Sequence, residues 1–231
     1  MVSALLIGGT GLGSHLLKNL VLHPTIVSIN TFSRRNPSNA NILSEKLEPF
    51  VSPDTSQWAE GIRHLSSPPD LFFSAFGTTR AAAGSFEAQY KLEHDLHLEL
   101  AKAAKAAGSR VCVLISSPFA NENSSMAYAR MKGQIEEGIK ALKFQKTIIL
   151  QPGIILGARG ESRVGEAIAQ EVVKVIGLIF PSIRDMMGQD AQVIARAAVT
   201  AGLRALEETN SANTAAIEII KRGELLQHAS P

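Results

Sequence analysis

A tyrosine and a lysine four residues apart, Tyr128 and Lys132, are the side chains of this 231-residue sequence best suited to acid–base chemistry. If the segment after Ser125 is helical, that spacing places the phenol and the ammonium side by side on one face. Ile135 and Ile139 continue the same face at helical spacing, so Lys132 is expected to point toward the core. A charged side chain on a buried stripe needs a chemical explanation.

The lysine charge can make the tyrosine acidic. A free phenol has a pKa near 10, and bringing it to about 7 takes about 4 kcal/mol of differential stabilisation of the phenolate. The Lys132 ammonium, aided by the cation of an oxidised nicotinamide, is a sufficient source. Ser117 follows an apolar run and would donate a hydrogen bond to a substrate oxygen. The predicted catalytic residues are therefore Ser117, Tyr128 and Lys132, the arrangement of a carbonyl reductase.

Two alternatives accompany this interpretation. Tyr128 could fill the core without taking part in chemistry, since a Tyr-x-x-x-Lys spacing also arises by chance. Ser116 could replace Ser117, but adjacent residues of a strand face opposite sides, and Ser116 is the less suitable of the two.

A glycine-rich turn lies near the start of the chain, in "ALLIGGTGLGSHLLKNL". It is a strand, a turn and the start of a helix, in the order that a dinucleotide fold needs. Gly8 would permit the tight turn and Gly11 the close approach of a pyrophosphate, with Ser14 in the third glycine position of the pattern. The predicted cofactor-binding residues of this turn are Gly8, Thr10, Gly11, Leu12 and Gly13.

The next expected strand ends in "TFSRRNP". NAD-binding folds place an acidic residue at this point to accept from the ribose 2′-hydroxyl. Here Ser33, Arg34 and Arg35 offer donors and positive charge, which suit a 2′-phosphate. The sequence therefore predicts NADP(H) as cofactor, with a solvated arginine pair as the alternative.

Short apolar runs alternate with stretches of helical period such as Phe86–Ala107, which ends at Gly108. Continuous apolar strands indicate a sheet covered on both faces, and ligands of such sheets bind at the carboxyl ends of the strands. We expect an α/β, Rossmann-type doubly wound parallel sheet in a single domain over residues 1–231, with residues 154–190 as a small C-terminal cap. The expected strands are Val2–Ile7, Ile26–Phe32, Leu47–Val51, Leu71–Ala75, Val111–Ile115, Thr147–Leu150 and Ala216–Ile220.

Composition limits the class of protein. The 23 basic and 21 acidic residues are spread along the chain, which argues against nucleic acid as a partner. The single cysteine, Cys112, lies in an apolar run and indicates a reducing compartment. The six histidines show no ligand spacing, so no metal is expected. The longest apolar stretch is shorter than the roughly 20 residues of a spanning helix, so no transmembrane segment is expected.

With these motifs, the chain resembles the atypical short-chain dehydrogenase/reductase family. It is most similar to the branch containing the human Tat-interacting tumour-suppressor protein and the fungal proteins of the mitochondrial outer membrane. The resemblance runs from about residue 4 to 165. It rests on "GTTRAAAG", on the "SS" and "YARMKG" pair, on "LKF", and on "ESR" at 161–163.

The resemblance implies further cofactor contacts. It places Asp54 near the adenine, and Pro152 and Gly153 against the nicotinamide. After the fourth strand it implies contacts from Ala75, Gly77, Thr78 and Thr79. Two departures lie beside the expected reaction centre: Gln151 stands where the family usually has Arg, and Pro118 with Phe119 replaces small residues.

The function expected is an NADPH-dependent oxidoreductase acting on a small carbonyl or hydroxyl compound. A redox-neutral isomerase, dehydratase or epimerase using the same pair is one alternative. A non-catalytic NADPH-binding regulatory protein is another, suggested by an apolar stripe from Ile168 to Ile179.

Relatives of this fold often form dimers, so a homodimer is one expectation. The start of the chain, already a strand, leaves no room for a signal peptide. A cytoplasmic location is therefore expected, or by resemblance a peripheral one on the mitochondrial outer membrane.

Overall fold

The computed structural model describes residues 1–37, 44–153, 155–156, 189–209 and 215–229. Its centre is a parallel sheet of seven strands in the order β3-β2-β1-β4-β5-β6-β9. Because every hydrogen-bonded pair in it is parallel, the carboxyl ends of all seven strands lie at one edge. The strands are β1 (Val2–Ile7), β2 (Ile26–Ser33), β3 (Leu47–Val51), β4 (Leu71–Ser74), β5 (Val111–Ile115), β6 (Lys146–Gln151) and β9 (Ala216–Lys221).

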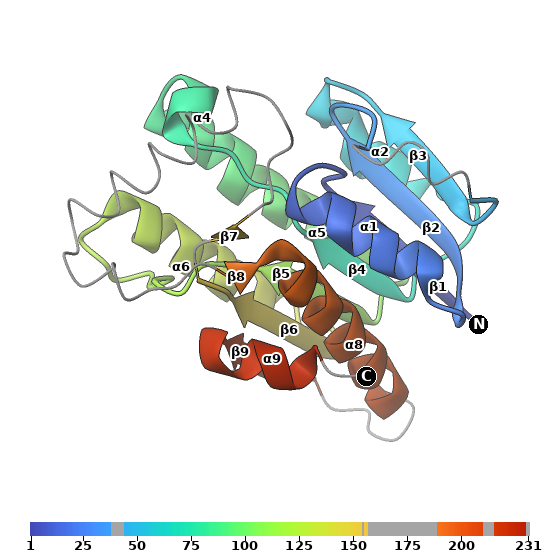
Figure 1. Ribbon diagram of the computed structural model, residues 1–231. Helices are drawn as coiled ribbons and strands as arrows, with labels where there is room; N and C mark the ends of the chain where they lie inside the picture. The colour runs from blue at the N-terminus through green and yellow to red at the C-terminus, as the bar shows by residue number, and fades with distance from the viewer. Residues whose placement is uncertain (38–43, 154, 157–188, 210–214, 230–231) are drawn as a thin grey trace.

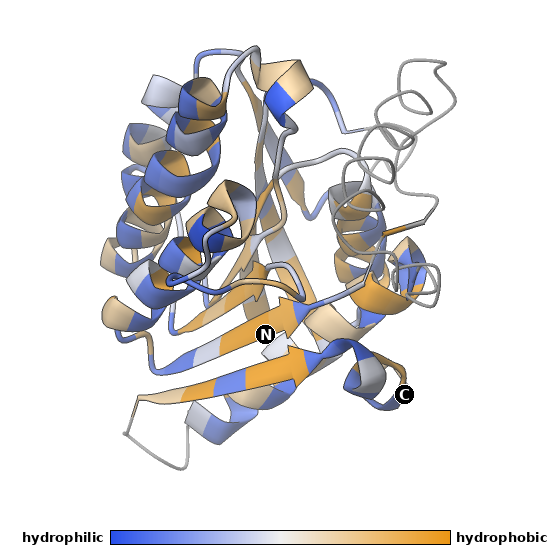
Figure 2. Cartoon of the chain, turned by 90° about the vertical axis from the view of Figure 1, so that its left-hand side faces the viewer, coloured by the Kyte–Doolittle hydropathy of each residue, from blue (hydrophilic) through white to orange (hydrophobic). Residues whose placement is uncertain are grey.

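Helices cover both faces of the sheet (Figure 1). On one face lie α1 (Leu12–Leu22), α8 (Ala191–Thr209) and α9 (Leu225–His228), and on the other α2 (Trp58–Arg63), α5 (Leu96–Ala106) and α6 (Ala127–Ala141). Alternate strand residues serve the two layers: Leu6 and Phe73 pack with the first group, and Leu5 and Phe72 with the second. Figure 2 shows the result, hydrophobic strands enclosed by helices of mixed hydropathy.

The predicted fold class is confirmed. All seven expected strands are present, and each end agrees with the prediction to within one residue. The inner strands β1, β2, β4, β5 and β6 are mostly buried, as expected for apolar strands covered on both faces. The edge strands β3 and β9 are largely exposed, so the expectation of full burial was wrong for them. The single domain over residues 1–231 stays a prediction.

The stretch predicted as Phe86–Ala107 is helical but not uniform. It consists of α4 (Phe86–Tyr90), a π-helical turn (Lys91–Asp95) and α5, and Gly108 follows with φ +112°. A π turn widens the helix by bonding i to i+5, and such turns are frequent at functional sites. Hydrophobic period alone does not reveal it.

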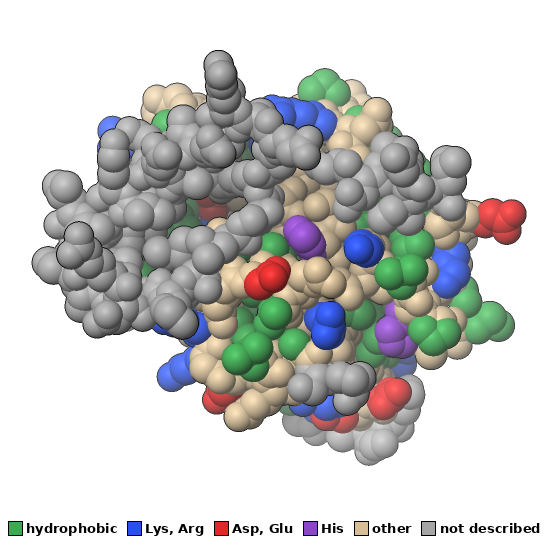
Figure 3. All heavy atoms as spheres, in the orientation of Figure 1, with side chains coloured by type: hydrophobic (Ala, Val, Ile, Leu, Met, Phe, Trp, Pro, Cys, Tyr) green, Lys and Arg blue, Asp and Glu red, His purple; other side chains and the backbone are tan. Residues whose placement is uncertain are grey.

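The predicted cap at residues 154–190 lies mostly outside the described residues, and so does the stripe from Ile168 to Ile179. At its two borders, β7 (Ile155–Leu156) and β8 (Gln189–Asp190) form a short parallel pair. In the part of the chain that the structure describes, no helix combines the length and the apolar character needed to cross a bilayer. On the face that Figure 3 shows, acidic, basic and hydrophobic side chains of the described residues are interspersed.

Candidate active site

The candidate residues meet at the carboxyl edge of the sheet. The glycine turn follows β1, Arg34 follows β2, Gly77 follows β4 and Ser117 follows β5. Parallel strands bring these loops together although the residues lie far apart in sequence. The order of strands, not any local motif, therefore assembles the site.

The glycine turn is built for close approach of its backbone. Gly11 caps α1 with φ +59°, and no described residue of the first helical turn is acidic. A Cβ on Gly13 would lie 1.7 Å from the carbonyl oxygen of Gly8, so only glycine fits there. Ser14 is buried and its hydroxyl donates to the Gly11 carbonyl at 2.7 Å. Gly13 thus provides the helix-to-strand packing, and Ser14 is compatible with the turn.

The two other predicted residues of this turn differ in exposure. Thr10 is exposed at the turn, whereas Leu12 is buried under the helix start. The positive end of the helix dipole makes the start of α1 suitable for an anion. In this structure the Gly13 amide donates to the Thr10 carbonyl and the Ser14 amide to the Gly11 carbonyl, each at 3.1 Å.

The residues after β2 divide into one buried hydroxyl and two exposed cations. The Ser33 hydroxyl is buried and donates to the Arg35 carbonyl at 2.7 Å, so it shapes the turn. Arg34 and Arg35 are exposed. Of the two guanidinium groups, that of Arg34 borders the cavity described next.

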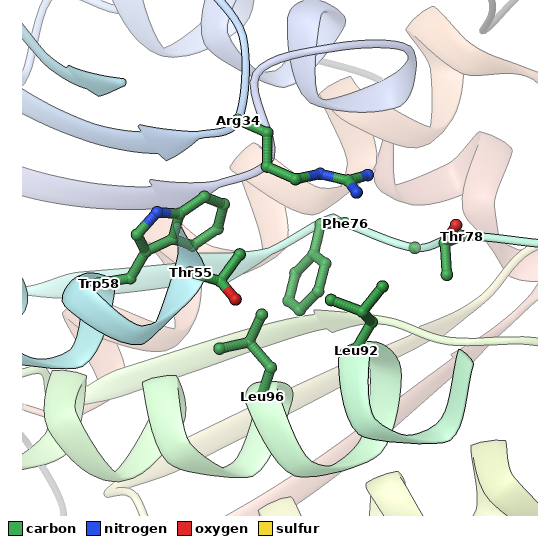
Figure 4. Close-up of a pocket in the computed structure, with 8 residues that line it drawn as sticks. Arg34, Thr55, Trp58, Phe76, Thr78, Leu92 and Leu96 are labelled. Carbon is green, nitrogen blue, oxygen red and sulfur yellow. The ribbon is translucent and has the colours of Figure 1, made fainter. Parts of the chain in front are cut away.

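A small pocket lies between the loops after β2, β3 and β4 and the α5 layer. Figure 4 shows the Arg34 side chain reaching across it toward Thr78, with the Phe76 ring pointing toward Leu92 and Leu96. The lining residues are Arg34, Thr55, Trp58, Phe76, Gly77, Thr78, Leu92 and Leu96. Sequence reasoning missed Thr55, Trp58, Phe76, Leu92 and Leu96, although the i, i+4 spacing of the two leucines was a readable signal.

Asp54 and Thr79 use their side chains to cap turns at the rim. Asp54 accepts from the Ser56 hydroxyl at 2.6 Å and amide at 3.0 Å, and these hydrogen bonds hold the pKa of its carboxyl below the usual value. Thr79 accepts from the Ala82 amide at 3.1 Å and so begins α3 (Arg80–Ala83). Both residues keep the shape of the loops that carry them.

Lys132 points inward, as predicted, and is 6% exposed. Its ammonium lies 2.6 Å from the Glu93 carboxylate, which belongs to the π-helical turn and is 1% exposed. The other Glu93 oxygen accepts from the Thr78 amide at 3.0 Å and from the Gln89 side chain at 3.2 Å. The carboxylate therefore joins the lysine to the loop after β4.

Each charge of this pair stabilises the other. Burial alone would lower the pKa of Lys132, but the adjacent Glu93 carboxylate together with Tyr128 and Glu136 outweighs it, and the pKa of Lys132 is raised above its ordinary value. Burial likewise opposes ionisation of Glu93, yet the Lys132 ammonium leaves the pKa of that carboxyl lowered. Lys132 is a cation and Glu93 an anion over the physiological pH range.

Tyr128 lies in the first turn of α6 and is 43% exposed. Its ring centre is 5.9 Å from the Lys132 ammonium. The predicted stripe is thus buried from Lys132 through Ile139 and open at its tyrosine end, where a substrate could approach. Ser117 is buried at the end of β5.

A second buried carboxylate, Glu136, lies one turn beyond Lys132 on α6. It accepts a short hydrogen bond from the Ser116 hydroxyl, and the Gln151 amide donates to it at 3.0 Å. Ser116 thus faces α6 and uses its hydroxyl in this contact. Gln151, noted as a departure from the family, has the structural role of holding Glu136.

The remaining predicted contacts lie at strand ends. The Ala75 amide donates to the Ile7 carbonyl at 3.1 Å, which extends the β1–β4 pairing into the loop. Pro152 is buried, and the buried Gly153 donates its amide to the Gln189 side chain at 2.8 Å. Among the described residues, no cluster of three or more His, Cys, Asp or Glu could hold a metal ion.

His97 packs under the loop after β4. It is fully buried, stacks on the Phe76 ring at a centroid distance of 4.0 Å, and shares a short hydrogen bond with the Glu93 carbonyl through Nδ1. Burial, with the nearby Lys132 charge, lowers the pKa of His97 to about 3. The imidazole is therefore neutral at physiological pH.

Comparison with known proteins gives close relatives. No model of a known protein family matches the chain. Protein fmp52-1, mitochondrial, from Aspergillus terreus is 48% identical over 228 residues, which is 98% of this chain and 98% of that protein. Protein fmp52, mitochondrial, from Aspergillus fumigatus is 53% identical over 209 residues, covering 90% of this chain and 89% of the relative.

Solved structures show the same fold at low sequence identity. A short chain dehydrogenase family protein from Francisella tularensis superimposes with a TM-score of 0.67 at 15% identity, covering 96% of this chain and 98% of that one. MoeE5 in complex with UDP-glucose and NAD gives 0.64 at 14% identity, covering 95% of this chain and 75% of that one. These likenesses support the Rossmann-type fold.

We expect Glu93→Gln to lower the free energy of unfolding by about 3–5 kcal/mol, because it leaves a buried ammonium without its counter-ion. Replacing both partners, in Glu93→Gln with Lys132→Met, should recover most of that loss. Urea unfolding can be followed by fluorescence of Trp58, the only tryptophan. Glu99→Gln, which removes an exposed carboxylate of α5, serves as control. A loss below about 1 kcal/mol for Glu93→Gln contradicts the prediction.

His97 should make the protein less stable in acid. The unfolded chain protonates this imidazole below about pH 6.5, whereas the folded protein resists protonation until about pH 3. The contribution of His97 to the free energy of unfolding is therefore complete above about pH 6.5 and is lost as the pH falls from there toward about pH 3. Between about pH 7 and pH 4.5, wild type should lose roughly 2–3 kcal/mol more than His97→Asn, as measured by urea unfolding. If wild type and His97→Asn lose equal free energy of unfolding over this pH range, His97 is not the cause of the acid sensitivity.

Proposed function

The chain belongs to the fungal Fmp52 branch of the atypical short-chain dehydrogenase/reductase family, and on this basis we propose that it is an NADPH-dependent oxidoreductase. It would interconvert a small carbonyl compound and the corresponding alcohol. The observation that carries the proposal is the buried, charged Lys132 beside the accessible phenol of Tyr128, at the sheet edge where the glycine turn lies.

The loops at this edge fit a dinucleotide. The backbone at Gly13 leaves no room for a Cβ, and the N-terminus of α1 offers amide groups for a pyrophosphate. The adenine would lie against the apolar pocket beside Leu92 and Leu96, whose lining includes Thr55, the residue after Asp54. Arg34 and Arg35 would hold a 2′-phosphate, which favours NADPH over NADH.

The chemistry divides between cofactor and protein. A bound reduced nicotinamide would supply a hydride for the carbonyl carbon. Tyr128 Oη would give its proton to the carbonyl oxygen, so that one hydride and one proton convert the carbonyl to an alcohol. Ser117 Oγ would donate a hydrogen bond to the same oxygen, and Lys132 would bind the nicotinamide ribose hydroxyls. The loops of Gly77, Thr78 and Thr79, and of Pro152 and Gly153, would hold the cofactor.

We propose a mitochondrial location for this chain, because the relatives compared are named mitochondrial. The finer proposal is that the protein is peripheral on the outer membrane. Purified mitochondria treated with protease test this, because a protein on the outer face is digested while matrix proteins survive. Survival of the protein in intact mitochondria would place it inside.

Arg34→Ala should weaken NADPH binding by about 10- to 100-fold, the value of a charge-assisted hydrogen bond, and leave NADH binding nearly unchanged. Titration calorimetry with each nucleotide measures both affinities. Arg63→Ala, which removes an exposed arginine of α2, is the matched control and should change neither. An equal loss for both nucleotides would mean that Arg34 does not read the 2′-phosphate.

Tyr128→Phe should lower turnover by about 100-fold or more and keep NADPH binding, because only the transferable proton is removed. A panel of small aldehydes and ketones, followed by nicotinamide absorbance, measures it. Tyr90→Phe changes the other tyrosine and should keep activity. Unchanged turnover in Tyr128→Phe refutes the acid–base role.

Substrate conversion without absorbance change would assign a redox-neutral isomerase, dehydratase or epimerase. Cofactor binding without any conversion would assign a regulatory protein.

A further inference from the structure

Glu93 has no part in the mechanism above, yet it makes the closest charged contact of Lys132. The ammonium and carboxylate are 2.6 Å apart, and their side chains are 8% and 2% exposed. Water is largely excluded from the pair, so solvent weakens its interactions much less than those of a surface ion pair. Tyr128 therefore experiences the electric field of the Lys132 ammonium and the opposite field of the Glu93 carboxylate together.

The titratable groups that face Lys132 come from three elements of the described chain. Glu93 belongs to the π-helical turn, His97 to α5, and Tyr128 and Glu136 to α6. His97 is neutral at physiological pH. Glu136 is eight residues beyond Tyr128, about 12 Å along the helix axis, and is held by Ser116 and Gln151. Glu93 is therefore the group that most directly offsets the lysine charge.

We propose that Glu93 is a positioning residue and the counter-charge of the site, whose carboxylate offsets Lys132 so that the Tyr128 phenol faces a nearly neutral pair in the ligand-free protein. This inference rests on the proposed function, because it concerns the same phenol. Lys132 alone then does not acidify Tyr128. Acidification follows when ligand hydroxyls draw the ammonium away from Glu93.

The contact with Thr78 links this counter-charge to the cofactor loop. One Glu93 oxygen binds the Thr78 amide, and the other binds Lys132. A ligand that shifts the loop after β4 would shift the carboxylate with it. The proton affinity of Tyr128 is thereby coupled to occupancy of the adjacent site.

The phenol can be titrated without substrate or cofactor. The chain has two tyrosines, so in a Tyr90→Phe background the phenolate absorbance reports Tyr128 alone. Four proteins are compared in that background: the background itself, Glu93→Gln, the neutral pair Glu93→Gln with Lys132→Met, and Glu99→Gln. Circular dichroism at each pH establishes that the protein is folded.

Removing the Glu93 charge should lower the pKa of Tyr128 by about one unit, because the ammonium is no longer offset. The neutral pair should titrate within about half a unit of the background, since the net charge of the pair is zero in both. Glu99→Gln should titrate with the background. The double variant Glu93→Gln with Lys132→Met is expected to fold, so its titration tests the proposal even if Glu93→Gln alone is unfolded.

Two results would overturn the proposal. One is an unchanged or raised pKa of Tyr128 in Glu93→Gln. The other is a rise of about one unit or more in the neutral pair, which would mean that Lys132 acts on Tyr128 without compensation. Either leaves the oxidoreductase function standing. Conversely, loss of the proposed function through absent NADPH binding or turnover leaves the titration result intact.

Discussion

The buried contact between Lys132 and Glu93 is the interaction on which the site depends. Taking two charges out of water is unfavourable, so each charge needs the other beside it, and the second carboxylate oxygen needs hydrogen-bond donors. The Thr78 amide and the Gln89 side chain meet that requirement on the carboxylate. The pair therefore fixes the relative placement of three elements: the loop after β4, the π-helical turn and α6.

The parallel sheet supplies the frame for this contact. It brings the loops after β1, β2, β4 and β5 to one edge, and the described helices pack on the two faces of the sheet. On α6, a Cβ at Gly133 would lie 2.0 Å from the Glu122 amide, so the loop after β5 rests directly on the helix. That contact presents the start of α6, and with it Tyr128, at the carboxyl edge of the sheet. Glu136 anchors the same helix to the ends of β5 and β6 through Ser116 and Gln151.

Sequence reasoning recovered the fold because apolar runs and glycine positions are local signals. The strands, the turn at Gly8 and the inward direction of Lys132 all follow from spacing within a few residues. Glu93 was not recoverable in this way, since it is 39 residues from its partner and sits in a stretch whose period indicates an ordinary helix. The contact between Ser116 and Glu136, which are 20 residues apart, was missed for the same reason. The contacts implied for Pro152 and Gly153 rest on resemblance, because a loop at a strand end carries no periodic signal.

The π-helical turn has a consequence for how relatives of this chain can diverge. Each residue of an α-helix rotates the chain by about 100°, and a π turn accommodates one more residue than an α turn does. Deleting or inserting a single residue between Tyr90 and Leu96 would rotate the Glu93 side chain out of the interior while leaving the helix intact. Substitutions there keep the register. The number of residues in this turn therefore matters more for the placement of Glu93 than most of their identities do.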